Sequence, residues 1–148
     1  MRASSSWTDD SGSASLEFVT AGLVLLVPLV YLVLAVSAIQ SAALATEGAA
    51  RQAARVFVIA DSEADARASA SAAVEFAFAD HGLDPALARV TVACDPQPCL
   101  TRRSLVTVSI DVDVPLPLAP AALGRSFALA VPIRASATQQ VSRFWVAG

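Results

Sequence analysis

Residues 12–39 read GSASLEFVTAGLVLLVPLVYLVLAVSAI, and this stretch decides how the chain folds. From Phe18 to Ile39 it carries no formal charge. As an α-helix this apolar segment spans ~33 Å, slightly more than the ~30 Å hydrocarbon core of a bilayer. A buried core helix of this kind needs a large domain around it, and the roughly 100 residues that follow are too few to cover every face. The sequence therefore predicts a membrane-spanning helix within residues 13–46.

The composition also separates this chain from ordinary soluble domains. Only 16% of its 148 residues are charged, against ~25% in a typical soluble domain. The ten basic residues are all Arg, and thirteen acidic residues leave a net charge of -3, so no nucleic-acid binding is expected. The single histidine, His81, and two cysteines cannot complete a usual four-ligand zinc site. We therefore expect a protein that is not an enzyme and that uses no metal and no cofactor.

A cleaved secretory signal is the alternative explanation of the apolar segment. Such signals have a basic n-region and an apolar core of ~7–15 residues. Here the core is longer, and residues 1–12 hold one Arg and two Asp. Cleavage at Ala43-Leu44-Ala45 would release a secreted domain that begins near Thr46.

Two features bear on which side of the membrane the C-terminal part lies. Arg51 and Arg55 follow the span and only Arg2 precedes it, which weakly favours a cytoplasmic C-terminal side. Cys94 and Cys99 bracket the turn-forming insert DPQP, which could bring the two sulfurs together. Disulfides persist in oxidising compartments, so a structural disulfide would place this part outside the cytoplasm. Two unrelated thiols, or a redox pair, are the alternatives.

A short motif stands directly before the apolar run. Gly12 is followed five residues later by Glu17 and then by Phe18. A carboxylate costs ~2.5–3.5 kcal/mol at the centre of a membrane helix and less near the interface. Glu17 can lie at the headgroup boundary, where the helix dipole favours a negative charge. Otherwise it needs a positively charged partner.

The pattern G-x-x-x-x-E-F followed by an apolar helix resembles the prepilin (class III) signal of type IV pilins and pseudopilins. The resemblance implies that an aspartyl membrane peptidase cuts between Gly12 and Ser13 on the cytoplasmic side and removes a leader, residues 1–12. It also implies a role in subunit assembly for Glu17 and the adjacent Phe18. As the fifth residue of the mature chain, Glu17 would pair with the N-terminal amine of a neighbouring subunit.

Residues 47–148 are predicted to form an extracytoplasmic α+β domain. The Ala-rich sequence continues the membrane helix as a stalk and then starts a second helix, with Ser62 near its N-cap and Gly82 at its left-handed end. After Pro85 the apolar period changes to two, which is typical of strands. The expected helices cover about 47–60 and 62–80, and the expected strands about 89–94, 104–114 and 126–140. The fold class is therefore α+β: a long N-terminal transmembrane helix continuing into a stalk, a second helix, then a small antiparallel sheet.

The second helix is expected to pack against the first through a small-residue face. The members of this face are Ala66, Ala70, Ala73, Val74 and Ala77, with Phe76 and Phe78 nearby. His81, near the end of the helix, is interpreted as a helix-end residue rather than a catalytic base, because the dipole at that end favours a positive charge.

Segment 104–114 alternates most clearly between apolar and polar residues. Its apolar positions are Val106, Val108, Ile110, Val112 and Val114. One sheet face is therefore expected to lie on a core and the other to face water. Asp111 and Asp113 share the polar face, where a solvated surface is favoured over a metal site because no third ligand is evident nearby. Pro132 predicts an edge position for the last strand.

Further segments extend the resemblance along most of the chain. The motif GSASLEF, the segment TEGAARQAAR at 46–55 and VDVPLPLAP at 112–120 occur in an order similar to that of TadE-like minor pilins (pseudopilins) of the tight-adherence (Tad/Flp) pilus. The resemblance implies a non-catalytic, single-pass inner-membrane subunit with a cytoplasmic N-terminus. Its implied partners are a prepilin peptidase, inner-membrane platform proteins, other Tad pilins and membrane lipid. The alternative is a bitopic anchored docking domain that never enters a filament.

Overall fold

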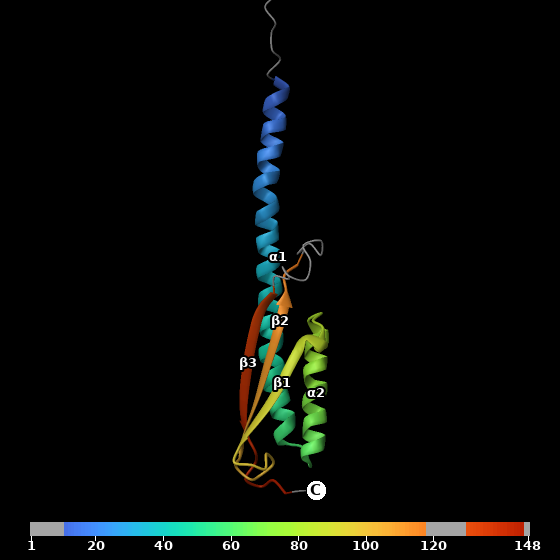
Figure 1. Cartoon of the computed structure of the whole chain (residues 1–148), viewed down its shortest axis with the longest axis vertical. Coiled ribbons are helices and arrows are strands. Elements are labelled where there is room, and N and C mark those ends of the chain that lie inside the picture. Colours follow the sequence, from blue (N-terminus) through green and yellow to red (C-terminus); the bar gives the residue numbers. More distant parts are fainter. Residues whose placement is uncertain (1–10, 118–129, 147–148) are drawn as a thin grey trace, which may run out of the picture. The chain divides into compact units, whose positions relative to one another are not determined.

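The computed structural model describes residues 11–117 and 130–146, which form an α+β arrangement (Figure 1). The elements in chain order are α1 (Ser11–Val58), α2 (Glu63–Asp80), the 3-10 turn η1 (Pro85–Leu87), β1 (Ala88–Asp95), β2 (Leu105–Pro115) and β3 (Ala130–Gln140). The predicted fold class is confirmed. The chain divides into two units, Met1–Val36 and Ser37–Gly148, and the second is called the head below.

In the N-terminal unit, the apolar side chains of α1 are exposed on every side of the helix. They include Leu16, Phe18, Leu23, Val24, Leu25, Leu26, Leu29, Val33 and Val36. Pro28 lies inside the helix and does not end it. A helix that is apolar all round needs an apolar environment, either lipid or other helices. By length and composition, α1 is able to cross a membrane.

In the head, α1 buries a stripe of small residues. These are Ala42, Ala45, Thr46, Ala49, Ala50, Ala53 and Ala54, followed by the larger Phe57. The hydroxyl of Thr46 donates to the carbonyl oxygen of Ala42 at 2.7 Å, so burial leaves it satisfied. On the exposed side, Arg51 and Glu47 form an ion pair at 2.9 Å. The small side chains allow neighbouring elements to approach this helix closely.

Helix α2 has the ends that its sequence predicts. The Ser62 hydroxyl is the N-cap and accepts from the backbone N–H of Asp65 at 3.2 Å. After the helix, Gly82 adopts a φ of +67°, a conformation that glycine takes without strain.

The buried face of α2 consists of Ala66, Ala70, Val74 and Phe78. The expectation that Phe76 lies near this face is wrong, because its side chain is 70% exposed. Phe76 precedes Phe78 by two residues, which places it about 200° around the helix and therefore on the opposite side.

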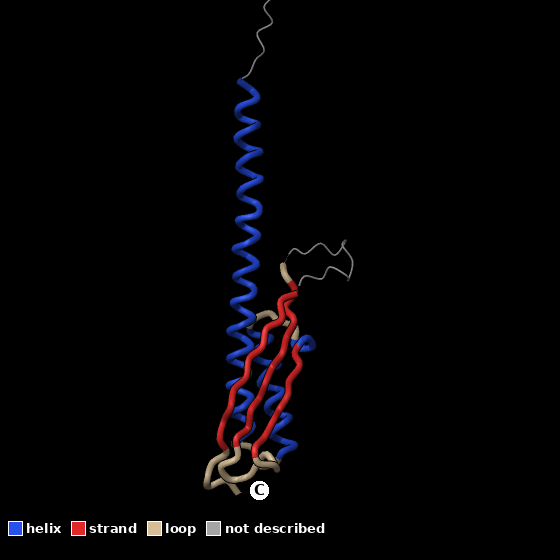
Figure 2. The backbone as a smooth tube through the Cα atoms, turned by 60° about the vertical axis from the view of Figure 1, so that its left-hand side comes forward, coloured by secondary structure: helices blue, strands red, loops and turns tan. Residues whose placement is uncertain are grey.

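The sheet is antiparallel with strand order β1-β2-β3 (Figure 2). β2 pairs with β1 from Ala88↔Val112 to Asp95↔Leu105 and with β3 over its whole length. Its predicted apolar positions, Val106, Val108, Ile110, Val112 and Val114, are all buried in one core with α2 and the head part of α1. Pro132 lies on an edge strand, as predicted. Of the expected strand 126–140, residues 126–129 lie outside the described residues.

Candidate functional site

The predicted processing motif lies on the backbone of one helix. α1 begins at Ser11, so Gly12 and Ser13 belong to its first turn. Glu17 follows Ser13 by four residues, which puts the two positions on the same side of the helix, ~6 Å apart along its axis. The motif and the apolar segment are therefore parts of a single continuous helix.

The side chains of this motif that the structure describes are open to their surroundings. Glu17 is exposed, and the Phe18 side chain is 81% exposed. Within residues 11–117 and 130–146, the ion pairs are Glu47–Arg51, Glu63–Arg67 and Asp111–Arg134, so Glu17 has none there. A carboxylate beside an apolar helix, with no cation paired to it among the described residues, is able to accept a cation from another molecule.

The second predicted pair, Cys94 and Cys99, lies in the head, where the two residues are joined in a disulfide. Their Cα atoms are 5.1 Å apart. The backbone N–H of Cys99 donates to Oε1 of Glu63 at 2.9 Å, and the hydroxyl of Ser104 donates to the carbonyl oxygen of Cys99. The closed loop is thereby tied to the first residue of α2 and to the residue that precedes β2.

Removing the disulfide is expected to lower the free energy of unfolding of the head by about 2 kcal/mol, because the loop that it closes is short. The double variant Cys94→Ala, Cys99→Ala is compared with the wild type by guanidinium unfolding of the full chain in detergent micelles. The reduced wild type is the control and should match the variant. A midpoint that does not move would show that the loop is held by its other contacts alone.

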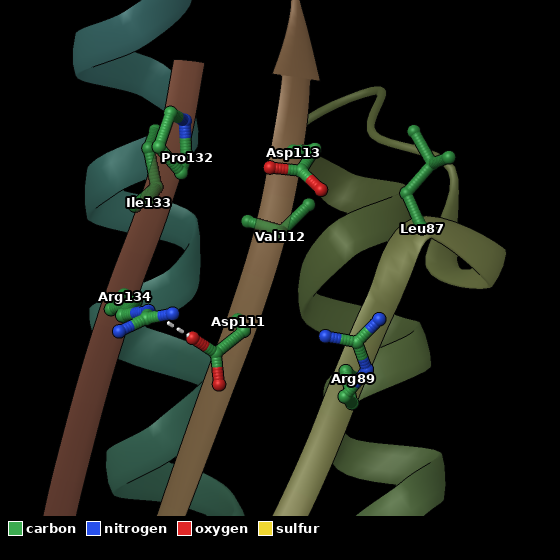
Figure 3. A pocket seen from close by; sticks show the side chains of 8 residues that line it. All are labelled: Leu87, Arg89, Asp111, Val112, Asp113, Pro132, Ile133 and Arg134. Atoms are coloured by element: carbon green, nitrogen blue, oxygen red, sulfur yellow. Dashed lines mark ion pairs between the residues drawn. The ribbon is translucent and has the colours of Figure 1, made fainter. Parts of the chain in front are cut away.

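The sheet face that points away from the helices carries a row of alternating charge. In register, Arg89 of β1 stands opposite Asp111 of β2, which stands opposite Arg134 of β3. Figure 3 shows Asp111 directed toward Arg134, with which it forms an ion pair. Arg89 and Asp113 line the same small cavity of about 70 Å³. Four of the residues that line this cavity, Arg89, Asp111, Asp113 and Arg134, are charged.

The two aspartates of β2 do not gather further metal ligands in the part of the chain that the structure describes. No group of three or more His, Cys, Asp or Glu side chains able to hold a metal ion occurs there. The sequence alone does not indicate the ion pair between Asp111 and Arg134. The two residues are 23 positions apart in the chain, and only the strand register places them opposite each other. The row is therefore a charged surface feature of the open sheet face.

His81 lies at the helix end where the sequence places it. It is the C-cap of α2, and its Nδ1 lies 3.2 Å from the hydroxyl oxygen of Ser41 on α1. This contact links the end of α2 to α1 within the head and gives the imidazole a structural role.

The C-terminal segment contacts the head through Trp145. The indole Nε1 of Trp145 donates to the carbonyl oxygen of Ala60 at 3.0 Å, and Nε of Arg102 donates to the carbonyl oxygen of Trp145 at 2.9 Å. Trp145 therefore packs on the head, just beyond the end of α1. Nothing in the local pattern indicates this, because the first bond joins residues 85 positions apart.

Comparisons with known proteins do not assign this chain to a family. No protein-family model, no curated protein and no solved structure matches this chain.

Proposed function

We propose that this protein is a TadE-like minor pilin or pseudopilin, a non-catalytic subunit for the assembly of a Tad/Flp-type pilus. One observation carries the proposal: the motif G-x-x-x-x-E-F lies at the start of a continuous helix whose apolar side chains, in the N-terminal unit, are exposed all round. Cleavage after Gly12 would free an amine at Ser13 while the helix stays in the membrane. The helix then has both an apolar surface for its neighbours and a carboxylate for their amines.

The pairing between Glu17 and an amine follows from the cost of placing charges among apolar helices. An ammonium and a carboxylate are each costly to desolvate alone, and their attraction offsets this cost when they meet. Ser13 and Glu17 of one chain are separated by about one turn of α1, so the amine of one subunit would reach Glu17 of a neighbour that is displaced along the helix axis. Such pairing also sets the axial register between the packed helices.

The proposed topology has a cytoplasmic N-terminus and an extracytoplasmic head. The disulfide between Cys94 and Cys99 supports this, because it belongs to an oxidising compartment. The prepilin peptidase and the inner-membrane platform would then meet the chain at its N-terminal end. Lipid, and later other Tad pilins, would surround the apolar part of α1.

Processing is tested by replacing the residue that precedes the proposed cut. The full chain, Gly12→Val and Gly22→Val are each expressed in membranes together with a prepilin peptidase of the Tad system. We expect the wild type and Gly22→Val to lose the leader and Gly12→Val to retain it. Gly22 is a matched control, since a Cβ there meets nothing within 4 Å. Equal processing of the two variants would favour the bitopic anchored docking domain. The same conclusion would follow if the leader stayed on all three proteins.

A further inference from the structure

The middle of the apolar segment of α1 contains one polar side chain, that of Tyr31. Tyr31 lies ~12 Å before the end of the segment at Ile39, because each residue of a helix rises ~1.5 Å. Long side chains on a helix lean toward its N-terminus, so the ring leans toward the middle of the segment and away from the nearer boundary. When α1 spans a membrane, the Tyr31 hydroxyl therefore lies in hydrocarbon, where an unpaired polar group is costly.

The described part of the chain leaves this hydroxyl without a partner. The Thr20 hydroxyl, nearer the start of the segment, donates to the carbonyl oxygen of Leu16 at 2.7 Å. Within residues 11–117 and 130–146, the Tyr31 hydroxyl makes no such bond. It is therefore a donor that needs an acceptor.

An open acceptor lies on the backbone of the same helix. Pro28 lies inside α1 and has no N–H, so the carbonyl oxygen of Val24, four residues earlier, loses its usual helical partner. Ser and Thr side chains can bond a carbonyl group three or four residues before them. Those two positions are Val27 and Pro28 itself, so no local hydroxyl replaces the missing N–H.

The donor and the acceptor belong to the same side of α1. Tyr31 follows Val24 by seven residues, which turn the helix by about 700°, only ~20° short of two full turns. Glu17 precedes Val24 by another seven residues, so the residue proposed to pair with an amine shares this side. A second helix that packs here meets the donor and the acceptor together.

The sizes of the side chains also distinguish this side of the helix. At ~100° per residue, Ala21 and Ala35 lie within ~60° of Val24, on the same side. The six leucines between Phe18 and Val36 all lie ~80° or more from Val24: Leu23, Leu25, Leu26, Leu29, Leu32 and Leu34. Small residues allow the backbones of membrane helices to approach closely, and a backbone carbonyl can be reached only at close approach. The side with Tyr31 therefore suits another helix, and the leucine side suits lipid.

A second copy of this chain supplies both groups that this side needs. A surface that carries one donor and one acceptor is complementary to itself. Copies inserted into one membrane with the same orientation have parallel α1 helices. A repeat of seven residues is the spacing at which parallel helices keep one seam in contact.

We propose that two parallel copies of α1 pack through the side that carries Val24 and Tyr31, and that the Tyr31 hydroxyl of one copy donates to the Val24 carbonyl oxygen of the other. Each copy thereby satisfies a polar group that the other leaves open in hydrocarbon. The proposal rests on the membrane-spanning position of α1 in the proposed function and not on cleavage after Gly12.

The packed side is identified by cysteine crosslinking of the full-length, uncleaved chain in phosphatidylcholine liposomes, without a peptidase. Ala35→Cys places a thiol on the proposed side. Val33→Cys is the matched control, because it lies two residues earlier at nearly the same depth but about 200° around the helix. Copper phenanthroline oxidises the introduced thiols, while the native disulfide of the head stays closed. We expect at least about fivefold more crosslinked dimer for Ala35→Cys. Equal yields, or a larger yield for Val33→Cys, would overturn the proposal.

The hydrogen bond itself is tested with Tyr31→Phe and Pro28→Ala in the Ala35→Cys background. The crosslinked fraction, measured over a range of protein-to-lipid ratios, gives the association constant. Each substitution should weaken association about threefold, because Phe removes the donor and Ala restores the N–H that occupies the acceptor. The double variant should be no weaker than either single variant, since one bond can be lost only once.

Three outcomes would contradict this bond. Association of Tyr31→Phe at the level of the Ala35→Cys parent would exclude the hydroxyl as the donor. Losses that add in the double variant would show that Tyr31 and Pro28 act on different contacts. A chain that stays monomeric at every protein-to-lipid ratio would overturn the proposal and leave this side of α1 for a helix of another protein. Since no peptidase is present, none of these outcomes depends on processing of the leader.

Discussion

Replacing Phe78 with Ala is expected to lower the free energy of unfolding of the head by about 3–5 kcal/mol. Phe78 is fully buried in the core shared by α1, α2 and the sheet. Truncating it removes apolar burial and leaves a cavity that the surrounding small residues cannot fill. The change is measured by guanidinium unfolding of the full chain in micelles. The fluorescence of Trp145 reports the unfolding, in a variant that also carries Trp7→Phe.

Phe76→Ala is the matched control for this measurement. It removes the same side chain from the same helix at a position where the ring is 70% exposed. Its effect on the unfolding free energy should stay within about 0.5 kcal/mol. Similar losses for the two variants would show that α2 does not pack on the core through the face that contains Phe78.

Replacing Glu17 with Ala is expected to spare removal of the leader but to lower incorporation into filaments at least about tenfold, because the amine of a neighbouring subunit is left unpaired among apolar helices. The measurement is the ratio of this protein in sheared pili to that in the membrane, determined by quantitative immunoblot. Glu17→Gln should behave in the same way, since it keeps the shape and removes the charge.

Glu47→Gln provides the control for the charge itself. Glu47 lies on the exposed side of α1 in the head, where it pairs with Arg51. Because it is far in sequence from the proposed pairing site at Glu17, removing its charge should leave incorporation unchanged. Normal incorporation of Glu17→Ala would exclude the proposed pairing. Failure of leader removal in that variant would instead assign Glu17 to recognition by the peptidase.

Much of the fold could be predicted from local patterns, because those patterns are themselves local physical effects. The apolar run from Phe18 to Ile39 predicts a long helix, and α1 contains it. The alternation around Ile110 predicts a strand with one buried face, and the structure shows that face on the core. Ser62 and Gly82 mark the ends of α2 because capping depends on the backbone of the next few residues.

Two features that sequence reasoning missed depend on long-range placement. The ion pair of Asp111 with Arg134 requires the strand register, and the contact of Trp145 with Ala60 joins distant parts of the chain. The exposure of Phe76 follows from the helical period, because Phe76 lies about 200° around α2 from the buried Phe78. A groove between α2 and β1 is lined by residues that are brought together only by the folded chain.

The processing site, and with it the proposed function, is tested most directly by the intact mass of the wild-type chain extracted from membranes that contain an active Tad prepilin peptidase. The account predicts a mature protein that begins at Ser13 and retains the apolar helix. A chain that still begins at Met1 would contradict it and leave an anchored domain. A chain that begins near Thr46 would contradict it in favour of a secreted protein.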